Sequence, residues 1–351
     1  MKRQLAEWMV CPVTGEKLSP RFEQEADGEI IEGELISASG RRYPITRGVP
    51  RMLPSDLVDE GQKATQQAFS AKWKRAKDFG YEQKSRSFYV NWYLQRYKFR
   101  TIEALRGFLS TKSRILDAGT GMGRDTSLYA DNSEAMVFGV DISTAIDLAY
   151  DHLKHYPNAH LIQADLTRLP FPTDFFDFIA CDQVLHHTRN TEQSFYTLVK
   201  HLATGGDLSV YVYRKKAPIR EFADDYLRRI AAEMDEEEVW KLSEQLAELG
   251  RILSEVSARI TVPDIPPLGL KAGTYDVQRF IYWNMLKCYW NASLDYQDNV
   301  LTNFDWYRPH YAHRHTSGEV RKWFADAGLE IITFDECDAG ISVRGRKKVL
   351  G

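Results

Sequence analysis

The sequence has few cysteines and no long hydrophobic run, and each absence excludes a class of protein. Its four cysteines are spread over 351 residues without the spacing of a disulfide framework. They are Cys11, Cys181, Cys288 and Cys337. No apolar stretch approaches the roughly 18 residues of a membrane-spanning helix, and Met1–Glu7 lacks the apolar core of a signal peptide. The sequence therefore predicts a cytoplasmic protein that has no membrane partner.

A large excess of one charge is also missing. The chain has 46 Lys and Arg residues against 49 Asp and Glu residues, a net charge of −3. Such a balance gives no bulk attraction to nucleic acid or to an anionic membrane surface. A nucleic-acid partner is therefore not expected from charge. The length of 351 residues suggests about two domains.

Glycine is concentrated where it indicates a ligand site. Residues 115–124 read Ile-Leu-Asp-Ala-Gly-Thr-Gly-Met-Gly-Arg, a short apolar strand followed by a turn with three glycines. Glycine adopts positive φ at little cost and lets a ligand approach the bare backbone. The helix that follows offers free N–H groups to an anionic part of the ligand. The segment predicts a nucleotide-like ligand over Gly119, Gly121 and Gly123.

Three later strands each end on or beside an aspartate. Residues 135–140, 160–163 and 176–181 read as buried strands, and they lead into Asp141, Asp165 and Asp182. Ligands bind at the carboxyl ends of parallel strands in open α/β sheets. Asp141 lies about 20 residues after the glycine turn, where such a crevice places the acid that holds ribose hydroxyls. Capping of the next helix would explain any single one of these aspartates, but not the set.

These motifs resemble those of the class I S-adenosylmethionine-dependent methyltransferases, with a core like that of methyltransferase type 11. In that family an acid, here Asp117, stands just before the glycines. A dinucleotide-dependent oxidoreductase is the runner-up, and Asp117 argues against it. The resemblance covers residues 113–213 well and residues 316–351 more loosely. It implies a Rossmann-like, doubly wound α/β fold with a seven-stranded sheet and S-adenosylmethionine as cofactor.

The resemblance also assigns roles to individual residues. The backbone of Gly119–Gly123 would face the methionine part of the cofactor, Asp141 would hold the ribose, and Ile142 would pack on the adenine. Asp165 with Leu166 would hold the other edge of the adenine. The implied cofactor-binding residues are Asp117, Gly119, Thr120, Gly121, Gly123, Asp141, Ile142, Asp165, Leu166, Asp182 and Gln183. No metal is expected in this set.

The chain divides into four parts. We expect a small β module over residues 1–54, an aromatic helical cap over 55–112, the methyltransferase core over 113–215 and 301–351, and a helical insertion over 216–300 that shapes the acceptor pocket. The aromatic residues of the cap include Trp73, Phe79 and Tyr89. Most of them are expected to be core.

The first module resembles the zinc-ribbon-like segment of the activator protein of tRNA methyltransferases. Zinc forms of that segment carry two Cys-x-x-Cys pairs. Here the first pair reads Cys11…Thr14, and residues 36–39 in place of the second read Ile-Ser-Ala-Ser. One thiolate cannot build a tetrahedral zinc site, so the module is expected to be metal-free. Its role stays open between an interaction surface, a dimer contact, a cover for the active site and added stability.

Histidines near the strand ends are the candidates for acceptor chemistry. His186 and His187 follow the fourth strand, and Tyr307, His313 and Arg314 precede a helix over 317–327 that Thr316 and Glu319 would cap. A hydroxyl or protonated amine needs a base to take its proton, and histidine suits that role near neutral pH. We therefore expect methyl transfer to an oxygen or nitrogen of a small molecule. A methyltransferase acting on RNA or protein, and a scaffold without catalysis, stay open as alternatives.

The insertion carries a helical seam. Apolar residues recur at steps of four and three from Leu242 to Ile260, a 3.5-residue period. The seam predicts packing on another helix of the chain, with residues 221–234 as the candidate, or a homodimer. The N-terminal module offers a second surface for such a dimer.

Overall fold

The computed structural model describes residues 1–77, 81 and 83–349, without the side chains of Ser55 and of residues 83–85. Phe79 of the predicted cap lies outside the described residues. The core is a seven-stranded sheet with the order β12-β13-β9-β8-β5-β6-β7. Its strands are β5 (Arg114–Ala118), β6 (Met136–Asp141), β7 (Ala159–Gln163), β8 (Phe176–Cys181), β9 (Leu202–Tyr213), β12 (Leu329–Glu336) and β13 (Gly340–Lys347). The first five are parallel, and β13 runs antiparallel to both of its neighbours. The expected Rossmann-like α/β fold is confirmed.

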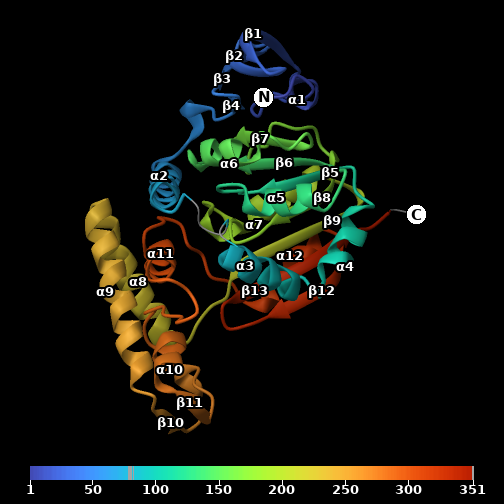
Figure 1. Cartoon of the computed structure of the whole chain (residues 1–351). Coiled ribbons are helices and arrows are strands. Elements are labelled where there is room, and N and C mark those ends of the chain that lie inside the picture. Colours follow the sequence, from blue (N-terminus) through green and yellow to red (C-terminus); the bar gives the residue numbers. More distant parts are fainter. Residues whose placement is uncertain (78–80, 82, 350–351) are drawn as a thin grey trace.

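Helices cover both faces of this sheet (Figure 1). They are α3 (Gln83–Arg96), α4 (Ile102–Leu109), α5 (Arg124–Asp131), α6 (Ala145–Leu153), α7 (Thr191–His201) and α12 (Ser317–Asp326). Successive residues of a strand point to opposite faces. Ile115 of β5 therefore packs with α3, α4 and α5, while Leu116 packs with α7 and α12. Helix α12 begins with the expected capping box of Thr316 and Glu319.

The N-terminal module contains α1 (Leu5–Trp8) and a four-stranded antiparallel sheet. The strands are β1 (Leu18–Ala26), β2 (Glu29–Ser37), β3 (Arg42–Thr46) and β4 (Val49–Pro50). The module lies against β7, the edge of the central sheet (Figure 1). Arg51 pairs with Gln163 as a parallel bridge, and Met52 N–H donates to the carbonyl of Gln163 at 2.7 Å. The module therefore continues the edge of the large sheet.

Hydrogen bonds join the two loops that carry metal in zinc ribbons. The carboxylate of Glu16 accepts from the hydroxyl of Thr14 at 2.9 Å and from the hydroxyl of Ser39 at 2.8 Å. The Cys11 thiol lies 3.1 Å from the hydroxyl of Tyr43. Among the residues that the structure describes, no group of three His, Cys, Asp or Glu side chains is placed to hold a metal ion.

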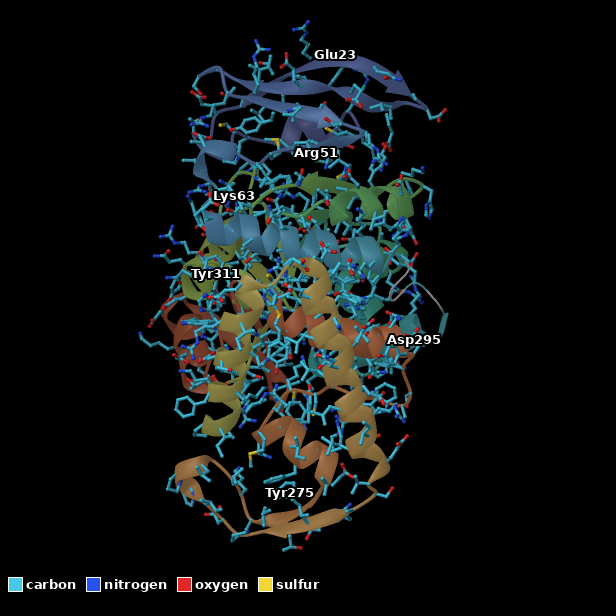
Figure 2. All side chains as sticks on the ribbon, turned by 90° about the vertical axis from the view of Figure 1, so that its left-hand side faces the viewer. Glu23, Arg51, Lys63, Tyr275, Asp295 and Tyr311 are labelled. Atoms are coloured by element: carbon cyan, nitrogen blue, oxygen red, sulfur yellow. The ribbon has the colours of Figure 1, made fainter. Side chains whose placement is uncertain are left out.

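The cap runs from the N-terminal module to the central sheet. It consists of a short 3-10 turn η1 (Ser55–Leu57), α2 (Glu60–Arg75), α3 and α4. Helix α2 begins with a capping box formed by Asp59 and Gln62. Figure 2, in which Lys63 marks α2, shows this helix lying across the molecule between the N-terminal sheet and the insertion.

The insertion contains two short strands besides the helices that the sequence predicted. It contains α8 (Pro218–Glu233), α9 (Glu236–Glu255), β10 (Arg259–Val262), the 3-10 turn η3 (Pro266–Leu268), β11 (Gly273–Asp276), α10 (Val277–Asn284) and α11 (Tyr296–Tyr307). The predicted seam is wrong at its end, because α9 stops at Glu255 and Ile260 lies in a hairpin of β10 and β11. Tyr275 marks this hairpin at the far end of the molecule in Figure 2.

The partner of the seam also differs from the candidate. Helix α9 packs mainly on α11, with Trp240 and Leu246 against Leu301 and Phe304. Helix α8 joins the same apolar cluster through Leu227 and Ala231. No helix within the described part of the chain is long and apolar enough to cross a membrane.

Candidate active site

A cavity of about 410 Å³ lies at the carboxyl ends of the parallel strands. Its floor comes from the segments after β5, β6, β7 and β8, while α2 and residues of α10 and α11 form other walls. Figure 1 shows α2 and α11 on this side of the sheet, with α9 alongside α11 and with α10 and the β10–β11 hairpin below. Strands that are distant in sequence thus place their ends around one space, as the strand pattern predicts.

The glycine turn forms the part of the floor after β5. Gly119, Gly121 and Gly123 have φ values of 92°, 56° and 92°, which favour glycine. A Cβ added at Gly119 would overlap the side chain of Val184, and one at Gly121 would lie 3.3 Å from the ring of Trp73. Gly119 and Gly121 line the cavity, whereas Gly123 caps the start of α5. The positive φ values and the close packing of Val184 and Trp73 therefore explain why this turn requires glycine, and its first two glycines lie on the cavity wall.

Asp117 is buried at the end of β5 beside this turn. Its carboxylate accepts a 2.7 Å hydrogen bond from the hydroxyl of Thr126, which in turn lies 2.7 Å from the hydroxyl of Thr120. Burial and the neighbouring carboxylate of Asp125 raise the pKa of Asp117 to about 7. A cationic ligand group in the cavity would favour the ionised form of this carboxyl.

Asp141 ends β6 and orders the opposite side of the turn. One carboxylate oxygen accepts from the N–H of Gly121 at 2.8 Å, and the other accepts from the N–H and hydroxyl of Ser143 at 2.8 and 2.6 Å. Burial raises the pKa of Asp141 although the bonds from Ser143 lower it. Each oxygen can accept further bonds, as a ribose diol would require.

Helix α2 covers the crevice between Asp141 and Asp165. Gln62 donates from its amide to the carboxylate of Asp165 at 2.9 Å, and Gln66 donates to the carbonyl of Ile142 at 2.9 Å. Leu166 follows Asp165 on the cavity wall. The residues that the resemblance assigns to the adenine therefore lie together, under a helix that the sequence identified only as part of an aromatic cap.

Asp182 and Gln183 follow β8. The carboxylate of Asp182 accepts from the guanidinium of Arg96 and from the hydroxyl of Tyr97, both at 2.8 Å. Gln183 has a φ of 61°, a conformation that costs energy in a residue with a side chain and is common at functional sites. Both residues line the cavity.

The two adjacent histidines have different places. His187 lines the cavity, while His186 is fully buried behind it with its ring centroid 3.7 Å from that of Tyr213. His187 Nδ1 lies 2.7 Å from the carbonyl oxygen of Tyr311. A carbonyl only accepts, so Nδ1 carries the proton and Nε2 is the basic nitrogen. Burial lowers the pKa of His187 to about 4, which keeps the free imidazole neutral at pH 7.

The other three candidates for the acceptor site lie outside the described lining of the cavity; they are Tyr307, His313 and Arg314. The hydroxyl of Tyr307 donates to the buried carboxylate of Asp224 at 3.1 Å. Arg314 pairs with Glu221 at 2.8 Å and also with Asp225. His313 contributes a backbone bond of 2.9 Å to the carbonyl of His186. None of the three side chains belongs to the described lining of the cavity.

Other lining residues were not expected from the sequence. Lys72 of α2 pairs with Asp305 of α11 at 2.9 Å, beside His187. The insertion adds four cationic side chains and four aromatic ones. These are Lys216, Arg220, Arg279 and Lys287, and Tyr282, Trp283, Tyr289 and Trp306. The aromatic content of the insertion is the one sequence signal for this wall; its lysines and arginines have no distinguishing pattern.

The floor of the cavity fits S-adenosylmethionine. Asp117, Asp125 and Asp182 line it together, with Asp125 paired to Arg124 and Asp182 to Arg96, and the remaining carboxylate oxygens suit a ligand that carries an ammonium and a sulfonium. Asp141 and Asp165 offer carboxylate oxygens to hydroxyl and amino groups, and Ile142 and Leu166 offer apolar surface. The chemistry and the order of these groups agree with the roles implied by the resemblance.

Comparisons with known proteins give the same family. Residues 115–206 match the methyltransferase domain family. The ubiquinone/menaquinone biosynthesis C-methyltransferase UbiE of Vibrio parahaemolyticus is 28% identical over 131 residues, covering 35% of this chain and 51% of that protein. An uncharacterized protein of Synechococcus sp. is 32% identical over 120 residues, covering 32% of this chain and 29% of that protein. This chain thus spans about half the length of its UbiE relatives.

Among solved structures, a S-adenosylmethionine dependent methyltransferase from Mesorhizobium loti aligns with a TM-score of 0.42 and 17% identity. The alignment covers 70% of this chain and 96% of that one. The matched region, residues 115–206, contains the glycine turn and the strand ends that carry Asp141, Asp165 and Asp182. The chain therefore contains the methyltransferase domain of a class I S-adenosylmethionine-dependent methyltransferase, with S-adenosylmethionine as its cofactor.

Proposed function

We propose that the protein transfers the methyl group of S-adenosylmethionine to a small molecule held between the glycine turn and the insertion. The observation that carries this proposal is the continuity of the cavity. Gly119 and Asp141 lie on one wall, His187 beside them, and Trp283 and Trp306 of the insertion on another. Because α2, α10 and α11 wall the cavity, a small acceptor is favoured over RNA or protein. A cavity with a separate wall for an acceptor also favours an enzyme over a scaffold protein without catalysis.

The protein has little covalent chemistry to supply. The bound cofactor provides a methyl group that its sulfonium already activates. The chain holds the acceptor in line with that methyl, and orientation of two reactants is worth about 7–11 kcal/mol. Aromatic residues of the insertion exclude water from the space.

His187 is the residue that we assign to the acceptor. Its Nε2 is unprotonated because Nδ1 donates to the Tyr311 carbonyl, so it accepts a hydrogen bond from an acceptor hydroxyl or amine and takes the proton. Asp305, whose charge favours the protonated form of His187, supports this role. We propose positioning roles for His186, Tyr307, His313 and Arg314, which hold the wall behind His187.

A carbon acceptor is the second candidate. The relatives named UbiE are described as C-methyltransferases, and a phenol-like acceptor that loses its proton to His187 would be nucleophilic at ring carbon as well as at oxygen. Nuclear magnetic resonance of the isolated product would separate the candidates, because a methyl on oxygen, nitrogen or carbon has a distinct shift.

The first test is cofactor binding by the full chain, measured by calorimetry with S-adenosylhomocysteine. Loss of a charged hydrogen-bond acceptor costs about 1.5–3 kcal/mol. Asp141→Ala is therefore expected to weaken binding by about ten-fold or more, whereas exposed Asp264→Ala is expected to bind like the wild type. Absence of binding by the wild-type protein would contradict the proposal.

The second test addresses His187. His187→Gln is expected to lower methyl transfer to an acceptor found by mass spectrometry of a metabolite extract by about a hundred-fold, with cofactor affinity within a few-fold of the wild type. His310→Gln replaces an exposed histidine of a nearby segment and serves as control. Full activity of His187→Gln would remove His187 from the mechanism.

A further inference from the structure

The two sides of the cavity differ in charge. The strand ends and the start of α5 contribute five aspartates, of which Asp125 pairs with Arg124 and Asp182 with Arg96; the five are Asp117, Asp125, Asp141, Asp165 and Asp182. Residues 216–289 contribute two lysines, two arginines and, among the described lining residues, no acid. The acidic side suits a cationic cofactor. The cationic side faces the space left for the acceptor.

Most of this positive charge has no counter-ion. Arg220 is the exception, since its Nε donates to both carboxylate oxygens of Asp224 at 2.9 Å. The ammonium of Lys216 donates to the carbonyls of Asp338 and Ala339, which bear no net charge. Within residues 1–77, 81 and 83–349, no carboxylate forms an ion pair with Lys216, Arg279 or Lys287. Three basic side chains of this wall thus lack a carboxylate partner in the described part of the chain, and burial lowers the pKa of one of them, Lys216, to about 7.

Lys287 is the most deeply buried of these three side chains. Its side chain is 6% exposed and its ammonium lies 4.4 Å from the ring centroid of Trp306. Burial holds the pKa of Lys287 well below its ordinary value, and the nearby Arg220 adds to this effect although Asp305 and Asp224 oppose it. Burial therefore favours the neutral amine of Lys287 in the free protein, because a buried charge without a partner is unfavourable. An anion in the cavity would supply the missing partner.

The same wall is aromatic. The rings of Tyr282 and Trp283 meet at 4.5 Å between centroids, nearly at right angles, and Trp306 packs on Tyr213 at 4.5 Å. Such rings favour a flat apolar body. The wall therefore combines surface for a planar group with cations at its edge.

We propose that the methyl acceptor is a small aromatic anion, whose carboxylate or phosphate group binds Lys287 with help from Lys216 and Arg279. The proposal rests on the proposed function, because it takes this wall to be the acceptor site. It names the chemical class of the acceptor, which the family match leaves open.

Binding of matched probes tests the charge preference. 4-Hydroxybenzoate and phenyl phosphate carry the two anionic groups, and 4-hydroxybenzamide is the neutral counterpart of the first. Titration of the S-adenosylhomocysteine-loaded full chain, followed by saturation-transfer NMR, is expected to give at least about ten-fold tighter binding of one or both anions than of the amide. The tighter anion identifies the group.

Substitution of single lysines tests whether Lys287 causes the preference for anions. Lys287→Met is expected to weaken anion binding by about ten-fold and to leave amide binding unchanged, whereas exposed Lys271→Met keeps the wild-type preference. Lys287→Met is also expected to raise the melting temperature, because it replaces a buried polar amine by an apolar side chain in an aromatic wall. This second readout confirms that the variant folds.

Two outcomes overturn the inference: the amide binds as tightly as the anions, or Lys287→Met keeps the preference for anions. Failure of S-adenosylhomocysteine to bind is a separate result. It contradicts the proposed function, while the anion preference is still measured with the free protein.

Discussion

Asp117 shows how a single buried carboxyl links the cofactor site to stability. It is 3% exposed, and burial raises its pKa to about 7, against about 4 in an unfolded chain. Between these values the folded protein binds the proton and the unfolded chain does not. The contribution of Asp117 to stability is therefore full below pH 4 and falls as the pH rises to about 7.

This pH dependence is testable with Asp117→Asn. Each pKa unit corresponds to about 1.4 kcal/mol. Between pH 5 and pH 8 the free energy of unfolding of the wild-type protein is therefore expected to fall by a few kcal/mol relative to that of the variant. Urea unfolding at the two pH values measures the difference. The other carboxyl groups titrate equally in both proteins, so their contributions cancel in the difference between the two free energies of unfolding. A parallel pH dependence of the two proteins would show that Asp117 is ionised throughout.

At the same scale, the residues proposed to hold the cofactor follow from sequence patterns, whereas most residues of the proposed acceptor wall do not. Asp117, Gly119 and Asp141 belong to short local patterns, in which a strand, a turn and a helix follow one another in the chain. Lys287 and Lys216 reach the cavity only because the insertion folds back over the sheet. Lys287 lies in the apolar and aromatic stretch of residues 285–290, which is consistent with burial but does not predict which cavity the side chain reaches.

At the scale of the element, α2 determines access to the cofactor crevice. Its contacts with the floor are Gln62 to Asp165 and Gln66 to the carbonyl of Ile142, and Lys72 ties it to Asp305 of α11. The cap was predicted from its aromatic residues, and the family resemblance implies that such a segment folds over the cofactor, but the contacts made by α2 were not predicted. Contacts of α2 with the strand ends and with α11 join residues 76 to 233 positions apart, and periodicity carries no information about such distant contacts.

Hydrogen exchange tests this role of α2. Gln66→Leu removes one hydrogen bond, worth about 1 kcal/mol, and is expected to speed exchange in α2 about five-fold. Gln67→Leu changes the neighbouring exposed glutamine and controls for side-chain effects on the helix. S-adenosylhomocysteine is expected to slow exchange in α2 of the wild-type protein. Unchanged exchange on ligand binding would mean that α2 does not respond to the cofactor.

For the whole molecule, the N-terminal module and the sheet share one core. Leu35, Tyr43 and Met52 of the module belong to the same apolar cluster as Phe138 and Phe171. Trp8 joins the two parts, with its ring 5.6 Å from Phe138 and 5.5 Å from His160. Lys2 adds bonds of 2.8 Å to the carbonyls of Tyr156 and Ala159. Among the roles left open by the sequence, this packing favours stabilisation of the sheet edge at β7.

A shared core predicts a single unfolding transition. Trp8 is half-buried, so Trp8→Ala is expected to cost about 2 kcal/mol, less than the roughly 3–5 kcal/mol of a fully buried tryptophan. The loss should lower the transition midpoint of the module and of the sheet together. Circular dichroism and the fluorescence of the remaining tryptophans measure both, and half-exposed Val13→Ala is the control. Two separate transitions in the variant would show that the module folds on its own and that β7 does not depend on it.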